Sequence, residues 1–430
     1  MDYGGVGALR GTLRSRAAPE QRGGTKPFGR LTQQHNMATP HYNPQRILFL
    51  AEGQLGDLLL LTPALRAVKE SFPTSFLAVL VVERRLAEPT HAPSPEVLVA
   101  SHAERERIAL GTNPNVDELY LLDRQALRAR HGIARLKAER AVIKCIREKK
   151  FDTVICTFPE DRFVQWAFAA GANVRVGQKH QALRWLLTHK LDSDKSTQGV
   201  LAYYCDLVRL IGANVQSTRT EYPIPPSATQ WAETTLNTLG VHPDSRIVAI
   251  HPGASGDYKM WPPERFALLA QELSSLGNVV LLVGSSFDRA ILEAITSTSR
   301  GTVREVHTGA SVANLAALLH RAHLCISNDS GPRHLAVAVG TPSLALFRHH
   351  HDKEWDVYPH SSRIAIIKGT EACPACPAGV CRDRIAPGEH FGAYCLRQIR
   401  VDTVLHRAAE MLREQPKKST PTPQHSSRIR

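Results

Sequence analysis

The sequence predicts an α/β protein built from two doubly wound domains, each with a parallel sheet. Three observations lead to this prediction. Short continuous apolar runs alternate with helical segments, as in sheets whose strands are buried on both faces. A stretch with three prolines, 217–227, interrupts the alternation, which then restarts. The length of 430 residues also exceeds what a single hydrophobic core usually organises.

The first predicted domain covers residues 46–216 and follows a basic tail, residues 1–45, that lacks periodicity and is expected to be disordered. Its strands are expected at 46–53, 76–83, 116–123 and 151–158. Its helices are expected at 57–73, 124–150 and 194–215. Residues 89–115 contain three prolines before Asn113 and are interpreted as an insertion or long loop.

The segment 217–227 is interpreted as a linker to a second domain over 228–410. Strands are expected there at 246–253, 278–286, 323–329 and 343–347. Helical segments are expected through Arg265 and Leu273, from Asp288, around Leu315 and from Gly331. A second disordered tail is expected from residue 411 to 430. Ligands of such sheets bind beyond the carboxyl ends of the strands, where the motifs of this chain stand.

Composition excludes several classes of protein. At 43% hydrophobic and 22% charged residues, the chain lies in the globular range, which excludes collagen, a coiled coil and wholesale disorder. The longest apolar candidate, 47–61, is broken by Glu52 and Asp57, so we expect no bilayer span. The basic N-terminus has no apolar segment of the kind found in secretory signals, and Met37 is an alternative start. A cytoplasmic location is therefore expected.

The net charge of +13 is concentrated at the ends of the chain. Residues 1–45 carry six basic and two acidic groups, and residues 411–430 carry five and one, so each tail has a net charge of +4. A nucleic-acid-binding protein would more often concentrate its charge on a folded face, so no nucleic-acid partner is expected. The helix at 124–150 has ten basic and two acidic residues. It is interpreted as a solvated face or as a surface for anionic membrane.

The first motif, AEGQLGD, ends a strand with the glycines Gly53 and Gly56 and continues to Asp57. It is not a dinucleotide-binding fingerprint, because the third glycine is absent. Asp57 has two interpretations. It is either a plain helix N-cap or a carboxylate at the strand end that takes a proton from a hydroxyl in the cleft.

The second and third motifs predict an anion site. In HPGASGDYK, small residues allow close backbone approach, and Lys259 can reach an anion such as a pyrophosphate, although an isolated loop lysine is usually just solvated. In NDSGPRH, Asp329, Ser330 and Gly331 lie between a strand and a helix, whose N-terminal dipole and free N–H groups suit a phosphate. His334 stands on the same helix face as Gly331.

These motifs resemble the bacterial heptosyltransferases of lipopolysaccharide core synthesis, over roughly residues 46–410. The matching segments are ILFLAEGQLGDLLLLTPALRAVKESFP, VAIHPGASGDYKMWPPERFALLA, LLVGSSFD and ANLAALLHRAHLCISNDSGPRHLAVAVGTPSLALF. The resemblance implies a GT-B fold, in which two Rossmann-like domains face a central cleft. It places the acceptor on the N-terminal domain and the nucleotide-sugar on the C-terminal domain.

The resemblance also implies roles for single residues. The catalytic base of the family falls on Asp57. Donor-binding positions fall on Ser255, Lys259, Asp329, Ser330, Gly331 and His334, with Asp288 a weaker candidate for the nucleotide ribose. The implied reaction is an inverting single displacement that moves heptose from ADP-heptose to a lipid-anchored glycan acceptor at the cytoplasmic face of the inner membrane. No metal or cofactor is expected, because a lysine and a helix dipole offset the charge of the leaving group.

Some features leave alternatives open. Glu52 and Gln54 stand where the family often has a basic residue, and this difference bears on acceptor choice. Cys373, Cys376, Cys381 and Cys395 form a cluster that fits reduced buried thiols, a metal site or a disulfide. The function alternatives are a transferase for a different sugar and glycan, and a binding protein that has lost transfer. The sequence does not identify the sugar, the acceptor, the linkage or the oligomeric state.

Overall fold

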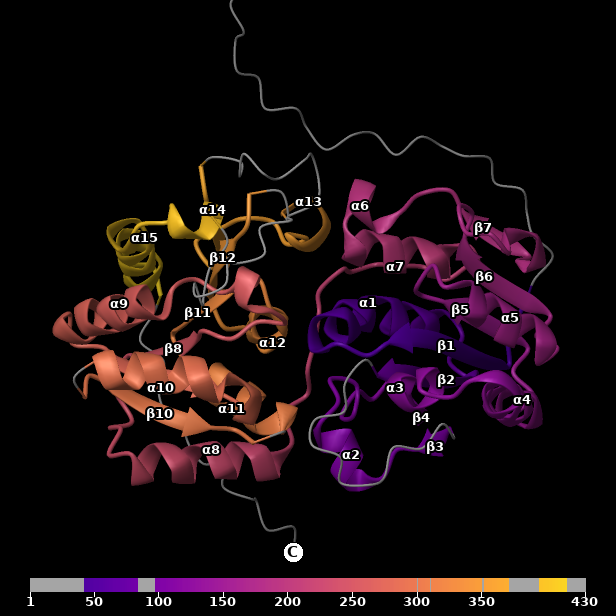
Figure 1. Cartoon of the computed structure of the whole chain (residues 1–430), viewed down its shortest axis with the longest axis horizontal. Helices are drawn as coiled ribbons and strands as arrows, with labels where there is room; N and C mark the ends of the chain where they lie inside the picture. Colours follow the sequence, from indigo (N-terminus) through magenta and orange to yellow (C-terminus); the bar gives the residue numbers. More distant parts are fainter. Residues whose placement is uncertain are drawn as a thin grey trace, which may run out of the picture. The chain divides into compact units, whose positions relative to one another are not determined.

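The computed structural model describes residues 42–83, 97–299, 301–309, 311–349, 352–370 and 394–415. The strands in these ranges form two sheets (Figure 1). The first has the order β3-β4-β2-β1-β5-β6-β7, and the second has the order β10-β9-β8-β11-β12-β13. All neighbouring strands are parallel except β3 and β4. The predicted α/β class with two parallel sheets is therefore confirmed.

The first sheet contains the four predicted strands and three more. Its strands are β1 (Arg46–Glu52), β2 (Phe76–Glu83), β3 (Leu98–Val99), β4 (Glu118–Asp123), β5 (Thr153–Cys156), β6 (Val174–Gln178) and β7 (His189–Leu191). The prediction missed β3, β6 and β7. These strands are short, and β6 and β7 carry polar residues near one sheet edge, so their sequences lack the apolar run that identified the central strands.

The helices of the first half differ from the prediction in several places, among them an unpredicted helix at Asp161–Ala169. They are α1 (Leu55–Ser71), α2 (His102–Glu106), α3 (Arg124–Arg128), α4 (Gly132–Glu148), α5 (Asp161–Ala169), α6 (Lys195–Gln198) and α7 (Val200–Arg209), with a 3₁₀ turn, η1, at Arg184–Leu186. The expected helix at 124–150 is two helices separated at 129–131, and Gly132 has a positive φ of 53°. Gly199, with φ of 84°, likewise separates α6 from α7. The expected loop at 89–115 contains β3 and α2 in its described part.

The second sheet consists of β8 (Ile247–His251), β9 (Val279–Gly284), β10 (Val303–His307), β11 (Leu324–Asn328), β12 (Ser343–Phe347) and β13 (Ile364–Lys368). The accompanying helices are α8 (Pro226–Thr238), α9 (Pro263–Ser275), α10 (Arg289–Thr298), α11 (Val312–Arg321), α12 (Gly331–Ala338), α13 (Asp352–Trp355), α14 (Tyr394–Arg397) and α15 (Val401–Arg413). Two 3₁₀ turns, η2 (Asp257–Lys259) and η3 (Ser286–Asp288), follow β8 and β9. No helix among these residues or those of the first half is long and apolar enough to cross a membrane.

At both ends, packed residues extend beyond the boundary predicted between the folded domains and the tails. Helix α15 packs against α9 and buries Met411 and Leu412, which the prediction had assigned to the C-terminal tail. At the other end, the hydroxyl of Tyr42 lies 2.5 Å from Thr153 Oγ1, so contacts with the first sheet begin before Arg46. In both cases a few apolar or aromatic side chains at the edge of a polar segment find a packing partner that is distant in sequence.

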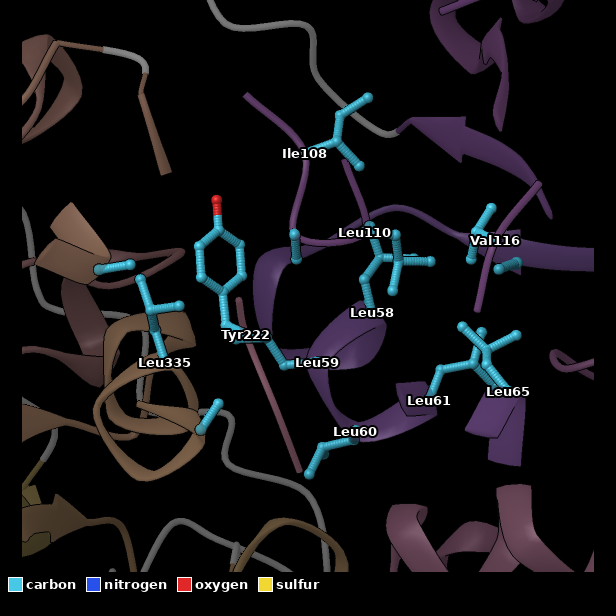
Figure 2. Packing of buried hydrophobic residues seen from close by; sticks show 14 of the residues in the cluster. Leu58, Leu59, Leu60, Leu61, Leu65, Ile108, Leu110, Val116, Tyr222 and Leu335 are labelled. Atoms are coloured by element: carbon cyan, nitrogen blue, oxygen red, sulfur yellow. The ribbon is translucent and has the colours of Figure 1, made fainter. Parts of the chain in front are cut away.

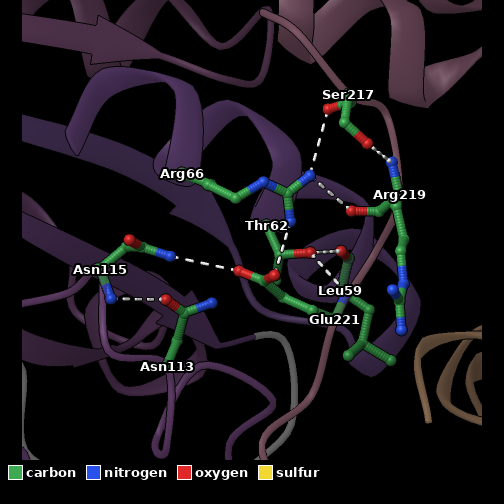
Figure 3. Close-up of polar contacts among 8 residues, drawn as sticks. All are labelled: Leu59, Thr62, Arg66, Asn113, Asn115, Ser217, Arg219 and Glu221. Atoms are coloured by element: carbon green, nitrogen blue, oxygen red, sulfur yellow. Dashed lines mark hydrogen bonds and ion pairs between the residues drawn. The ribbon is translucent and has the colours of Figure 1, made fainter. Parts of the chain in front are cut away.

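The segment predicted as a linker contacts α1 through several hydrogen bonds. Arg66 of α1 donates to Glu221 at 2.5 Å and to the carbonyls of Ser217 and Arg219 at 3.1 and 2.9 Å (Figure 3). The backbone N–H of Glu221 donates to the buried hydroxyl of Thr62 at 3.2 Å. These contacts hold the proline-rich segment against α1.

One hydrophobic core includes residues from both halves of the chain. Figure 2 shows leucines of α1 extending toward Ile108 and Val116 of the first half and toward Tyr222 and Leu335. Leu335 belongs to α12, which packs against α1. The N-terminal turn of α1 is therefore held against the helix that follows the NDSG motif.

Candidate active site

A pocket of about 220 Å³ lies where strands β1, β8 and β11 end and helices α1 and α12 begin. Its lining includes Gly56, Asp57, Ser255, Lys259, Asp288, Asp329, Ser330, Gly331 and His334. It therefore contains the predicted base and every predicted donor-binding residue. Gly53 is not in the lining; a Cβ there would lie 2.5 Å from a Val81 side-chain carbon, so this glycine serves the contact between β1 and β2.

Asp57 is not the N-cap of α1. The cap is Gln54, whose side chain makes no capping hydrogen bond, and Asp57 lies within the first helical turn. The side chain of Asp57 is half-buried and lines the pocket. The capping interpretation is therefore wrong, because the helix begins two residues before Asp57. A carboxylate in the first turn still benefits from the helix dipole.

The first turns of α1 and α12 meet at two glycines. A Cβ on Gly56 would lie 2.9 Å from the His334 ring, and a Cβ on Gly331 would lie 2.8 Å from Leu55 Cβ. Neither glycine has a positive φ, so each is required by close packing and not by its backbone conformation. This close approach brings Asp57 next to the loop that carries Asp329 and Ser330.

Lys259 and Asp329 form the charged centre of the pocket. Their charged atoms are 3.9 Å apart, and their side chains are 17% and 6% exposed. Burial lowers the pKa of Lys259, and the carboxylates of Asp329 and Asp57 partly oppose this shift. Burial raises the pKa of Asp329, opposed by Lys259 and by the nearby Arg333. An anion in the pocket would relieve the cost of burying the ammonium group.

The start of α12 offers donors for such an anion. Ser330 is the N-cap residue, but its side chain makes no capping bond, and its buried Oγ has no hydrogen-bond partner among the described residues. Pro332 stands in the first turn, where its missing N–H costs nothing. The Ser330 hydroxyl and the Gly331 N–H are thus available at the positive end of the helix dipole.

His334 is a buried, neutral imidazole. Burial lowers its pKa well below the usual range, and the positive charges of Arg333 and Lys259 lower it further. Its Nδ1 lies 3.1 Å from the hydroxyl of Tyr358, and its ring lies 6.4 Å from that of Trp355. His334 therefore contributes a fixed, uncharged surface to the pocket.

Asp288 has a structural role in the loop after β9. Its carboxylate accepts hydrogen bonds from the N–H and the hydroxyl of Ser285, both at 2.9 Å, and pairs with His251 at 3.7 Å. Burial acts to raise the pKa of Asp288, but these hydrogen bonds and the charge of His251 outweigh it and lower the pKa to about 2. Asp288 also borders a second pocket of about 250 Å³, lined on its far side by residues between Thr308 and Leu315.

The structure adds site residues that sequence reasoning missed. Arg333 is fully buried, pairs with Asp356 at 2.5 Å and donates to the carbonyl of Trp355 at 3.1 Å. It stands inside the NDSGPRH motif, so its position was a usable signal. Trp355, by contrast, lines the pocket from a segment with no recognisable motif.

Glu52 and Gln54, the two unusual residues of the first motif, lie in different surroundings. Glu52 is buried and paired with Arg124, which also bonds Glu160 at 2.8 Å, so Glu52 forms part of an internal ion pair. Only Gln54 of the two unusual positions lines the pocket.

Of the cysteine cluster, Cys395 is described and buried, and the other three cysteines lie outside the described residues. Within the described ranges, no three potential metal ligands come together.

Comparisons with known proteins identify the family. The model of glycosyltransferase family 9 (heptosyltransferase) matches residues 139–384. Lipopolysaccharide heptosyltransferase 3 of Escherichia coli is 24% identical over 306 residues, which cover 68% of this chain and 80% of that protein.

Two solved structures share the fold. A family 9 glycosyltransferase from Veillonella parvula DSM 2008 has a TM-score of 0.67 at 20% identity, covering 87% of this chain and 98% of that one. The E. coli heptosyltransferase WaaC, solved with ADP-2-deoxy-2-fluoro heptose, has a TM-score of 0.58 at 17% identity, covering 85% and 99%. The two sheets thus form the GT-B arrangement, and the chain belongs to glycosyltransferase family 9, the heptosyltransferases.

Proposed function

We propose that this enzyme transfers a heptose from ADP-heptose to a glycan acceptor of the lipopolysaccharide core, with inversion at the anomeric carbon. One observation carries the proposal: a single pocket combines the Asp57 carboxylate with an anion cradle built from Lys259, Ser330 and Gly331. The relatives support the choice of sugar, because one is named a lipopolysaccharide heptosyltransferase and another was solved with an ADP-heptose analogue.

The donor fits the second half of the chain, which we assign as the donor domain. The diphosphate would lie on Lys259, the exposed Ser255 and the start of α12, where an ammonium group and backbone donors face it. The nucleoside would extend past Asp288 into the adjoining pocket. That pocket shares Leu55, His251, Asp288 and Pro332 with the first, so one ligand can occupy both.

The acceptor would approach from the first half, which we assign as the acceptor domain. Asp57 takes the proton from an acceptor hydroxyl as its oxygen attacks the anomeric carbon. The new carbon–oxygen bond forms while the bond from that carbon to the diphosphate breaks, and ADP leaves with the electron pair. Lys259 and the donors at Ser330 and Gly331 stabilise the negative charge that develops on the diphosphate. A single displacement of this kind inverts the anomeric configuration.

Asp57→Asn tests the proposed base. The substitution keeps the size of the side chain but removes the proton acceptor. We expect transfer to fall about 10²–10⁴-fold, as for loss of a general base. ADP affinity and melting temperature should stay near the wild-type values, because the diphosphate contacts come from the other half of the chain. Asp244→Asn, at an exposed position, is the matched control.

Two results would contradict the proposal. Wild-type turnover in Asp57→Asn would remove Asp57 from the chemistry. A thermal-shift series with ADP-heptose, other ADP-sugars and UDP-sugars tests the donor, and stronger stabilisation by a UDP-sugar than by ADP-heptose would overturn the assignment of the donor.

We also propose that α4 contacts an anionic membrane surface that carries the acceptor lipid. Its buried side consists of Ala138, Val142 and Ile146. Its outward side carries the exposed basic residues Lys137, Arg140, Lys144 and Arg147, and the apolar residues Ile133 and Leu136, which are 75% and 50% exposed. Each basic residue near anionic lipid contributes about 1 kcal/mol.

Vesicle sedimentation tests this contact. The wild type should bind vesicles containing phosphatidylglycerol and not vesicles of phosphatidylcholine alone, and binding should decrease with salt. Changing Lys137 and Arg140 to Glu should weaken binding, whereas the same change at Arg304, an exposed basic residue of β10, should not. Equal binding of the α4 variant and the wild type would refute the assignment of this surface.

A further inference from the structure

Trp355 reaches the first pocket from α13, the helix between β12 and β13. It lines that pocket together with Asp57 and Lys259, and its side chain is half-buried. Among the described residues of the lining, it has the largest apolar side chain. Ligand sites combine such apolar surface with a few polar groups that fix orientation. In the proposed transfer the polar groups of this pocket have roles, and Trp355 has none so far.

A buried arginine fixes the backbone at Trp355. Arg333 of α12 is fully buried, donates to the Trp355 carbonyl at 3.1 Å and pairs with Asp356 at 2.5 Å. Its Cζ lies 4.7 Å from the ring centre of Phe347 and 5.5 Å from that of Tyr358. Burying a charge is costly unless it is paired and hydrogen-bonded, and these contacts offset much of the cost. The backbone at 355–356 is therefore held firmly against α12.

The imidazole of His334 connects Trp355 with the first turn of α1. The ring centres of His334 and Trp355 are 6.4 Å apart. On the other side, a Cβ on Gly56 would lie 2.9 Å from a carbon of the His334 ring. All three residues line the pocket. A continuous wall thus runs from Trp355 through His334 to the turn that carries Asp57.

The two adjoining pockets indicate which part of the donor would meet this wall. Asp288 borders both pockets. Asp57, His334 and Trp355 line the first pocket only. In the proposed complex the nucleoside occupies the second pocket, the diphosphate lies on Lys259 and the start of α12, and the anomeric carbon lies near Asp57. The transferred sugar would therefore lie against the wall that contains Trp355.

We propose that the indole ring of Trp355 binds the transferred sugar of the donor, and that Arg333 positions this ring. A pyranose carries C–H groups on its faces, and an aromatic ring offers them a flat apolar surface. The indole N–H can also donate to a sugar hydroxyl. Trp355 thus contacts the substrate, whereas Arg333 acts through it. The inference rests on the proposed function, because it takes the donor to be a nucleotide-sugar with its diphosphate on Lys259.

Trp355→Ala separates binding of the sugar from binding of the nucleotide. In titration calorimetry without acceptor, its affinity for ADP-heptose should fall about 10-fold to 100-fold, the loss expected for a buried aromatic contact. Its affinity for ADP should change less than about twofold, because ADP lacks the transferred sugar. Trp355→Phe keeps part of the aromatic surface, so it should lose less affinity, and it serves as the test should the alanine variant not fold.

Two results would overturn the role of Trp355. One is an unchanged affinity for ADP-heptose. The other is an equal loss for ADP-heptose and ADP, which would show that the side chain only supports the shape of the pocket. Trp185→Ala is the matched control, because Trp185 of η1 is 70% exposed and does not line the pocket. Both affinities should stay at their wild-type values in this variant.

Tryptophan fluorescence gives an independent readout. ADP-heptose should change the emission of the wild type and of Trp185→Phe beyond the change that ADP causes, because the sugar lies on the Trp355 ring. This additional change should vanish in Trp355→Phe. If it persists there, another tryptophan senses the sugar and the proposal is wrong.

Arg333→Lys tests the positioning role. Lysine keeps the positive charge but lacks the planar fork that bonds the Trp355 carbonyl and Asp356 together. We expect the same selective loss of affinity for ADP-heptose, and in a double-mutant cycle with Trp355→Ala the two losses should not add. Additive losses would show that Arg333 does not act through Trp355. If Arg333→Lys does not fold, Asp356→Asn, which weakens the same anchor, takes its place in the cycle.

The outcomes separate this inference from the proposed function. If the wild type transfers heptose from ADP-heptose while Trp355→Ala keeps full affinity for it, the role of Trp355 is wrong and the proposed function stands. If the wild type binds another nucleotide-sugar more tightly than ADP-heptose, the proposed donor is wrong. The same variants, measured with that nucleotide-sugar, then decide whether Trp355 binds its sugar.

Discussion

Lys259→Met should weaken the binding of ADP without unfolding the protein. Methionine has a similar length and keeps the aliphatic packing, so the change removes the ammonium alone. The side chain of Lys259 is 17% exposed, and its Nζ lies 3.9 Å from Asp329. Water therefore has little access to the position of the ammonium group. It cannot readily replace the hydrogen bond that the diphosphate loses.

The size of the effect follows from that burial. A hydrogen bond to a charged group contributes about 1.5–3 kcal/mol, which corresponds to about 10-fold to 150-fold in affinity. Because the side chain of Lys259 is mostly buried, we expect a value in the upper part of this range. Asp329 keeps the attraction of Arg333 and Arg348 when Lys259 is removed, so the fold should tolerate the change.

Titration calorimetry with ADP measures this loss, and Lys353→Met, an exposed position on α13, is the control. The pH dependence gives a second readout. Because burial lowers the pKa of Lys259, wild-type affinity for ADP should begin to fall below the alkaline range in which lysine usually titrates. Lys259→Met should lack this dependence. A folded variant whose affinity stays within about twofold of wild type would place the diphosphate elsewhere.

Two further predictions concern stability. Burial raises the pKa of Glu83 from 4.5 to about 7, so its contribution to stability is present below pH 4.5 and is lost as the pH rises through 7. Glu83→Gln should therefore stabilise the protein above pH 7, by up to about 3 kcal/mol in chemical unfolding, and the gain should vanish below pH 4.5; a gain that is equal at both pH values would contradict this account. Gly331→Ala should cost about 1–3 kcal/mol and weaken ADP binding, because the added Cβ would lie 2.8 Å from Leu55 and force α1 away from α12; unchanged unfolding and ADP titrations would show that α1 yields without cost.

The central strands were predictable because burial on both faces requires continuous apolar runs. Strand β2 matches its predicted range, Phe76–Glu83, and β12 matches Ser343–Phe347. The same rule fails at sheet edges, where β7 consists of the three residues His189–Leu191, one of them an exposed lysine. The helix boundaries at Gly132 and Gly199 were missed because a glycine is compatible with a helix until its φ is known.

Much of the pocket was also predictable. In parallel sheets, the carboxyl ends of the strands lie at one edge, so Asp57, Lys259 and Asp329 were expected to converge from their positions after strands. The role of Asp57 was less certain, since a carboxylate near a helix start is compatible with a cap. Only the observed start of α1 at Leu55 rules out that alternative.

The sequence by itself thus determined the fold class, the family and the polar residues that gather in the pocket, because apolar periodicity and strand-end motifs are local properties. Tertiary structure alone decided the contacts that support these residues. Helix α7 packs against α1, and Arg66 binds Glu221 across 155 positions. Such contacts depend on how helices pack, and packing selects partners by shape and burial over the whole chain, so no local pattern could predict them.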